Sequence, residues 1–158
     1  MEIIQLPLER FEEMNALFDM DSVEGFREKR LANLQACREI CIVALENDEI
    51  IGEINIMTEN INIPAAVIPN FRVYLFGFRV KEAHRRKGVG RQLMANAIAL
   101  CMKRGIFQFA VGVEKDNKGA RRFYERCGFQ PLFQNCCEEQ QGRKCVFDLL
   151  LLDTTPRN

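Results

Sequence analysis

The sequence has no apolar run long enough to cross a membrane. A transmembrane helix needs about 20 consecutive apolar residues, and the late run from Val146 to Leu152 is far shorter. That run is typical of a buried strand instead. The N-terminal residues Met1-Glu2-Ile3-Ile4 also lack the pattern of a signal peptide. We therefore expect a cytoplasmic protein that does not bind membranes.

The chain is also poor in histidine, and its cysteines follow no regular spacing. The chain has one histidine, His84, and seven irregularly placed cysteines, at positions 37, 41, 101, 127, 136, 137 and 145. Cys136, Cys137 and Cys145 lack CxxC spacing and a nearby histidine, so we expect no bound metal. An odd number of cysteines without a signal peptide predicts reduced thiols. Cys101 and Cys127 fit the apolar faces of helices.

The net charge is zero, but the charges are unevenly distributed along the chain. Residues 1–60 hold 14 Asp and Glu against 5 Lys and Arg, a balance of −9. Residues 61–158 hold 17 Lys and Arg against 8 Asp and Glu, a balance of +9. One interpretation is ordinary solvation of a surface on which the segments mix. The other is a basic half for an anionic cofactor and an acidic half for a cationic acceptor.

The basic, glycine-containing stretch Arg85-Arg86-Lys87-Gly88-Val89-Gly90 predicts an anion site. It follows an apolar strand pattern and begins a helical pattern that continues to Arg104. At such a helix N-terminus, free backbone N–H groups and the helix dipole favour an anion. Glycines let the backbone approach a phosphate closely. A tight basic turn without a ligand is the alternative.

Two common phosphate motifs are missing from this stretch. A P-loop needs Gly-Lys-Ser/Thr, and here Gly90 is followed by Arg91. A dinucleotide-binding fingerprint needs a third glycine where the chain has Leu93. A phosphate bound here must therefore belong to another class of ligand.

A second motif lies about thirty positions downstream. A strand pattern ends near Val113, and a short helix follows with Asp116 or Asn117 as its N-cap. Apolar residues then recur at helical spacing, and Gly128 ends the helix.

Together, Arg-x-x-Gly-x-Gly and the downstream Asn-x-x-Ala-x-x-Phe-Tyr-x-x-x-Gly-Phe resemble the GCN5-related N-acetyltransferase (GNAT) superfamily. The close resemblance covers about residues 78–129, and the first half of the chain matches only in the order of its elements. The resemblance implies the GNAT acyl-CoA N-acyltransferase fold, an α/β (α+β) sandwich. A mixed six- to seven-stranded sheet would be flanked by about four helices, in a single domain over residues 1–158.

Hydrophobic periodicity and turn signals predict the individual elements. Strands are expected at residues 3–6, 40–45, 50–57, 72–80, 106–113, 131–134 and 143–151. Helices are expected from Pro7 to about 18, from a Ser22 cap toward 37, over 89–104 and after Asn117. The segment 72–113 reads as a strand–helix–strand crossover, which predicts two parallel strands.

The resemblance also implies chemistry, because family members bind acetyl-CoA and pass the acetyl group to an amine in a ternary complex. The backbone amides of Arg85, Arg86, Lys87, Gly88, Val89, Gly90 and Arg91 would hold the pyrophosphate. Main-chain groups of Phe78 and Val80 would pair with the pantetheine arm, and the Val80 N–H would polarise the thioester carbonyl. Asn117 would hydrogen-bond the pantetheine, and Phe123 would pack beside it. Arg86, Lys87 and Arg91 could meet the 3′-phosphate or simply solvate the loop.

By the same resemblance, Tyr124 is the expected general acid for the leaving thiolate, with packing in the core as its alternative role. The general base is open. Some relatives have a glutamate where this chain has Tyr74, so that residue cannot be transferred. Glu53 could act directly, through water or as an amine anchor, or could be an outward-facing strand residue. His84 is expected to contact phosphate or solvent, and a water chain without a dedicated base is also open.

Two other classes of function compete with an N-acetyltransferase. The fold could bind acyl-CoA without catalysis, as a sensor or degenerate member. Nucleic-acid binding is disfavoured, because the net charge is zero and no aromatic residues interleave with the basic cluster. The acceptor amine could belong to a small molecule, such as a polyamine, antibiotic or amino acid, or to a peptide N-terminus. Members of the family are often dimers, which makes a homodimer an open expectation.

Overall fold

Strand β4, Arg72–Val80, passes through both of the compact units into which the chain divides. Unit 1 comprises Met1–Met57 and Gly77–Leu100, and unit 2 comprises Thr58–Phe76 and Cys101–Asn158. The computed structural model describes residues 1–17, 25–59, 61–140 and 143–157. A single domain over 1–158 stays a prediction.

Seven strands form a mixed sheet in the order β1-β2-β3-β4-β5-β7-β6, as the predicted fold requires. The strands besides β4 are β1 Glu2–Gln5, β2 Glu39–Glu46, β3 Glu49–Met57, β5 Gln108–Glu114, β6 Gln130–Gln140 and β7 Arg143–Asp153. The helices are α1 Phe11–Leu17, α2 Phe26–Gln35, α3 Val89–Lys103 and α4 Lys118–Arg126, with 3₁₀ turns η1 Leu8–Arg10 and η3 Glu82–His84. Among the described residues, no helix is long and apolar enough to span a membrane.

In unit 1, β2 and β3 form the hairpin that the sequence predicts. They pair antiparallel from Glu39↔Met57 to Glu46↔Glu49. The turn residues Asn47 and Asp48 have φ of 50° and 65°, the left-handed pair that suits a tight hairpin. The hairpin therefore forms where turn residues and alternating apolar residues coincide.

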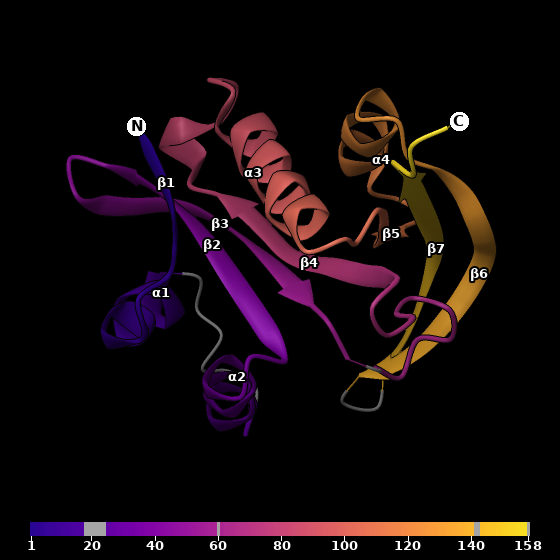
Figure 1. Ribbon diagram of the computed structural model, residues 1–158, viewed down its shortest axis with the longest axis horizontal. Helices are drawn as coiled ribbons and strands as arrows, with labels where there is room; N and C mark the ends of the chain where they lie inside the picture. The colour runs from indigo at the N-terminus through magenta and orange to yellow at the C-terminus, as the bar shows by residue number, and fades with distance from the viewer. Residues whose placement is uncertain (18–24, 60, 141–142, 158) are drawn as a thin grey trace. The chain divides into compact units, whose positions relative to one another are not determined.

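The two faces of the β2–β3 hairpin meet different helices. On one face Val43 belongs to a core cluster with Phe11 and Met14 of α1. On the other face, a Cβ added to Gly52 would lie 3.1 Å from Leu93 Cδ1 of α3. Figure 1 shows α3 on the opposite side of these strands from α1 and α2. The small residue at position 52 thus lets α3 pack close to the sheet.

In unit 2, the first half of β4 pairs with β5 in parallel, which confirms that part of the predicted crossover. The register runs from Arg72↔Gln108 to Leu75↔Val111. Strand β7 pairs antiparallel with both β5 and β6. The core of this unit includes Ala110, Phe147 and Leu149. The late apolar run is therefore a strand, as expected, and it is buried at residues 147–150, whereas Val146 is exposed.

Some predicted boundaries were wrong. Strand β6 was expected over 131–134, but it extends over Gln130–Gln140 with two register irregularities. Its second half is mostly polar because it pairs with β7 at the edge of the sheet, so hydropathy carried no signal for it. The helix expected from Pro7 begins as η1 and becomes α-helical at Phe11. Ser22, the predicted cap of the next helix, lies outside the described residues.

Candidate functional site

The loop between β4 and α3 in unit 1 carries the basic glycine-containing stretch. After Val80, the Lys81 N–H donates to the Ile51 carbonyl at 2.8 Å, which anchors the end of the strand to β3. Residues Arg86 and Gly88 then adopt left-handed φ values of 63° and 82°, and α3 begins at Val89. The chain reverses within these few residues, so consecutive backbone amides are presented at the helix N-terminus.

These amides can donate hydrogen bonds to an anion. The Gln92 N–H donates to the Gly88 carbonyl at 3.1 Å and closes the first turn of α3. The amides of Val89, Gly90 and Arg91 precede this bond and therefore have no carbonyl acceptor within the helix. A Cβ built on Gly88 would meet no heavy atom within 4 Å, so the space beside this residue is open.

The basic side chains near the loop divide into two groups. The Arg85 Nε donates to the Val80 carbonyl at 2.9 Å and ties the loop to the end of β4. His84 Nδ1 lies 2.9 Å from Glu46 Oε2, so the lone histidine pairs with a carboxylate. Arg86, Lys87 and Arg91 are exposed around the turn. These three side chains can reach a polyanion, whereas Arg85 already positions the loop.

Strand β4 bends just before Phe78 and Val80, the two residues expected to face the pantetheine arm. Gly77 has a φ of 55°, and a Cβ at this position would lie 2.6 Å from Asn55 Nδ2. Val73 and Leu75 are buried, but every residue from 76 to 80 is partly exposed. The alternating burial of the strand therefore ends at this bend.

Glu53 lies in a buried polar cluster on the same face of the sheet as α2. Arg30 of α2 donates to Glu39 Oε1 at 2.9 Å, to Glu53 Oε2 at 3.1 Å and to Asn55 Oδ1 at 2.6 Å. All four side chains are at most 3% exposed, and Glu53 is 0% exposed. Cys41 completes the cluster with its Sγ 3.8 Å from Glu53 Oε2. The expected outward-facing alternative for Glu53 was wrong.

Electrostatics within this cluster are strongly perturbed. Burial lowers the pKa of Arg30, but the neighbouring carboxylates, Glu53 foremost, outweigh this effect and raise it overall. Burial raises the pKa of Glu39. Burial and the nearby Glu53 raise the pKa of Cys41 well above its usual value. The Arg30 guanidinium therefore stays charged, and the Cys41 thiol stays protonated.

The other Glu53 oxygen is less well satisfied. Among the described residues, Oε1 has no hydrogen-bond partner, and Arg79 Nη1 of β4 lies 3.8 Å away. That distance makes an ion pair but is too long for a hydrogen bond. Glu53 therefore connects α2 with β4, because one oxygen binds Arg30 and the other pairs with Arg79.

Unit 2 holds the second predicted motif on α4. The Asn117 side chain accepts a hydrogen bond from the Ala120 N–H at 3.2 Å, which confirms it as the N-cap. Tyr124 is 9% exposed and packs against Phe123 and Phe129, with ring centroids 5.8 and 5.6 Å apart. Burial raises the pKa of Tyr124 to about 12. Its phenol is therefore neutral at pH 7 and can donate a proton.

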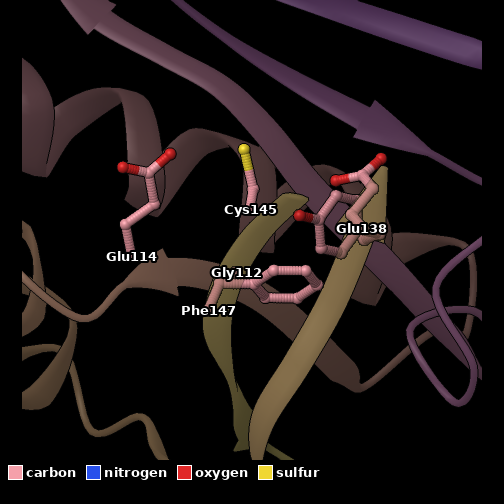
Figure 2. A pocket seen from close by; sticks show the side chains of 6 residues that line it. Gly112, Glu114, Glu138, Cys145 and Phe147 are labelled. Atoms are coloured by element: carbon pink, nitrogen blue, oxygen red, sulfur yellow. The ribbon is translucent and has the colours of Figure 1, made fainter. Parts of the chain in front are cut away.

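A small pocket in unit 2 is lined by Tyr74, Gly112, Glu114, Glu138, Cys145 and Phe147, with a volume of about 120 Å³. In Figure 2 the Cys145 thiol lies between the carboxyl groups of Glu114 and Glu138, above the Phe147 ring. Burial, followed by the nearby Glu138, raises the pKa of Tyr74. Lys115 and Lys144 line the adjoining hollow beside Glu114, so the carboxylates are not an isolated acidic surface.

The sequence-predicted residues thus fall into two groups. The loop residues 85–91, Phe78, Val80 and Glu53 belong to unit 1, whereas Asn117, Phe123 and Tyr124 belong to unit 2. Sequence reasoning missed Arg30, Asn55 and the bend at Gly77. A buried arginine is visible only once α2 is packed on the sheet, whereas the glycine within a strand pattern was an available signal for a bulge or bend.

The family model for the acetyltransferase (GNAT) family matches residues 4–129, which include both the loop before α3 and helix α4. The chain belongs to the GNAT family. N-alpha-acetyltransferase 30 of Schizosaccharomyces pombe is 29% identical over 91 residues, 58% of this chain and 57% of that protein. The chloroplastic GCN5-related N-acetyltransferase 10 of Arabidopsis thaliana is 23% identical over 138 residues, 81% of this chain and 54% of that protein. The chain spans about half the length of these GNAT relatives.

Solved structures confirm the GNAT fold. An aminoglycoside 6′-N-acetyltransferase complexed with coenzyme A has a TM-score of 0.75 and 14% identity, with 100% of this chain and 99% of that chain covered. A putative acetyltransferase from Salmonella typhimurium with acetyl-CoA has a TM-score of 0.76 and 18% identity, with 99% and 95% covered. At these identities the likeness concerns the fold alone.

Proposed function

We propose that this GNAT protein transfers the acetyl group of acetyl-CoA to a primary amine, by direct attack of the amine in a ternary complex. The observation that carries the proposal is the left-handed turn at Arg86 and Gly88, which presents backbone amides at the start of α3. Family membership and the coenzyme A and acetyl-CoA complexes of the structural neighbours support the choice of ligand.

Residues of unit 1 would bind the anionic part of acetyl-CoA. The amides of residues 86–91 would hold the pyrophosphate, since those of Val89, Gly90 and Arg91 have no acceptor within α3 and the helix dipole favours an anion. The Arg85 N–H, which the sequence also suggested, already donates to the Glu82 carbonyl at 3.2 Å. The exposed Arg86, Lys87 and Arg91 would meet the 3′-phosphate. Main-chain groups of Phe78 and Val80 would pair with the pantetheine arm, and the Val80 N–H would polarise the thioester carbonyl.

Three residues of unit 2 have proposed roles toward the pantetheine arm and the leaving thiolate. Asn117 would hydrogen-bond the pantetheine through its amide N–H, because its Oδ1 is used in the N-cap. Phe123 would pack beside the arm. Tyr124 would protonate the departing thiolate, a role that its neutral phenol supports.

Glu53 remains a proposed route for the proton lost by the amine. Its burial and its bond to Arg30 favour action through water or neighbouring groups over direct contact with the amine. A pH–rate profile of Glu53→Gln tests this role. Loss of rate that is greatest at low pH supports a base, whereas a profile parallel to that of the wild type removes Glu53 from proton transfer.

A non-catalytic acyl-CoA-binding sensor is the alternative function. A screen of acceptor amines separates the two functions, with thiol released from acetyl-CoA as the readout. The acceptors are polyamines, aminoglycosides, amino acids and N-terminal peptides. Relatives named as N-alpha-acetyltransferases and an aminoglycoside acetyltransferase make peptide N-termini and aminoglycosides the first choices. Binding of acetyl-CoA without thiol release by any acceptor would support the sensor.

A homodimer and a cytoplasmic location stay predictions.

Gly88→Asp, with Gly105→Asp as its control, tests the phosphate site. The two glycines have φ of 82° and 80°, and an added Cβ at either would meet no heavy atom within 4 Å. Asp is among the residues that tolerate such φ values best, so backbone strain is matched and only the position of the charge differs. We expect calorimetry to show acetyl-CoA binding weakened by at least about 100-fold in Gly88→Asp, from like charge beside the pyrophosphate. Undiminished affinity would refute the site.

A further inference from the structure

Arg30, Glu39, Glu53 and Asn55 place three formal charges in the interior of unit 1. Taking such charges out of water costs free energy that their mutual attraction often fails to recover, and apolar side chains of similar size are frequently as stable. Stability alone is therefore a poor explanation for this cluster. A role in fixing one particular conformation is the alternative that charged, directional contacts can fulfil.

Asn55 connects the cluster to strand β4. Its Oδ1 accepts from Arg30 at 2.6 Å, and its Nδ2 donates to the Gly77 carbonyl at 3.3 Å. Arg30 thereby fixes which end of the amide faces the strand. The Asn55 amide occupies the space beside Gly77, where a Cβ would lie 2.6 Å from Nδ2. The left-handed bend and its buried donor are thus matched to each other.

Glu53 makes a second connection to the same strand. Oε2 accepts from Arg30 at 3.1 Å, while Oε1 faces Arg79 at 3.8 Å. Through Asn55 and Glu53, the Arg30 guanidinium is therefore linked to Gly77 and Arg79 of β4. Phe78, the first residue expected to pair with pantetheine, lies between them.

We propose that Arg30 is a positioning residue for the cofactor-binding end of β4. Through Asn55 and Glu53 it holds the bend at Gly77 and thereby sets the direction of the main-chain groups of Phe78 and Val80. The bend is formed by residues of the chain itself. Its consequence for acetyl-CoA rests on the proposed function.

The test compares Asn55→Leu with Asn15→Leu. Asn15 lies on α1 of the same unit and is 1% exposed, against 0% for Asn55. Both changes replace a buried amide by an apolar side chain of similar size, but only Asn55 contacts Gly77. Amide hydrogen exchange of residues 77–80 is measured without ligand, and KM for acetyl-CoA and kcat are measured separately.

We expect Asn55→Leu to speed exchange at residues 77–80 by about tenfold, the size of one lost hydrogen bond. KM for acetyl-CoA should rise by about tenfold, and kcat should fall by a smaller factor, because the displaced Val80 N–H would also polarise the thioester carbonyl. Asn15→Leu should change neither quantity beyond its general effect on stability. Equal exchange in the two variants would overturn the proposal, and so would faster exchange with unchanged KM.

Arg30→Lys is the second variant, in case Asn55→Leu does not fold. It keeps the positive charge but cannot bridge Glu39, Glu53 and Asn55 with one planar fork. We expect the same pattern of faster exchange at residues 77–80 and higher KM, and wild-type values for both would overturn the proposal. If the wild-type protein itself does not bind acetyl-CoA, the proposed function fails, while the exchange data still decide whether the cluster holds the bend.

Discussion

Units 1 and 2 each bury a carboxylate against an arginine, but the hydrogen bonding of the two carboxylates differs. In unit 2, Asp148 is 4% exposed and both of its oxygens have close partners. Oδ1 accepts from the Asn135 N–H at 3.0 Å and pairs with Lys115 at 3.2 Å, and Oδ2 accepts from Arg121 at 2.6 Å. In unit 1, Glu53 Oε2 accepts from Arg30, but Oε1 has only the ion pair with Arg79 among the described residues.

Asp148 and the Arg30 cluster also differ in their access to water. Asp148 joins β7 to β6 and to α4, and its cations stay in contact with water, with Lys115 47% and Arg121 30% exposed. Arg30 is 3% exposed and has no such access. The cluster of unit 1 is therefore the more costly of the two, and its sensitivity to change should be correspondingly greater.

The largest expected effect comes from Arg30→Met compared with Arg121→Met. Removing Arg30 leaves two buried carboxylates, so the free energy of unfolding should fall by about 3–5 kcal/mol. Removing Arg121 leaves Asp148 with Lys115 and the Asn135 N–H, so the loss should be about 1 kcal/mol. Urea denaturation at pH 7 measures both losses. Equal losses would contradict the distinction between the units. Adding Glu39→Gln and Glu53→Gln to Arg30→Met should restore part of its lost free energy of unfolding.

A smaller effect should appear in acid. The Asn135 N–H, with help from Arg121 and Lys115, lowers the pKa of Asp148 from 3.8 to about 2. A carboxyl whose pKa is lower in the folded state stabilises the fold above its unfolded pKa. This contribution is lost as the pH falls from about 4 toward 2, and it amounts to about 2 kcal/mol. The difference in unfolding free energy between wild type and Asp148→Asn should therefore shrink over this range. A difference independent of pH would contradict this assignment.

The sequence could predict the loop and α4 because their signals are local. Within residues 85–91, glycine, basic residues and a helix start occur together, and Asn117 caps the helix that it begins. The Arg30 cluster could not be predicted in this way. Its members lie 9 to 25 positions from Arg30, and only the register of β2 and β3 and the packing of α2 bring them together.

A count of charges along the chain likewise cannot show which of them are buried. The acidic excess of residues 1–60 suggested an attraction for a cationic acceptor. Two of those carboxylates, Glu39 and Glu53, lie inside unit 1 against Arg30 and are at most 3% exposed. A count along the sequence treats both as surface charges. In the interior they contribute little to the attraction of a cationic acceptor. The pocket of unit 2 was also missed, because its carboxylates come from different strands.

The smallest expected effect comes from removing the Tyr124 hydroxyl in unit 2. Tyr124→Phe should lower kcat by about tenfold, near 1.4 kcal/mol of barrier, with acetyl-CoA affinity unchanged. Tyr74→Phe is the matched control, since Tyr74 is another partly buried tyrosine of unit 2 with a raised pKa. Because the pKa of Tyr124 is about 12, its phenol stays protonated across the usual assay range. Deletion of the hydroxyl should therefore lower kcat by the same factor from pH 6 to 9. Unchanged kcat would remove Tyr124 from the mechanism, and an equal loss in Tyr74→Phe would mean that the effect is packing rather than proton donation.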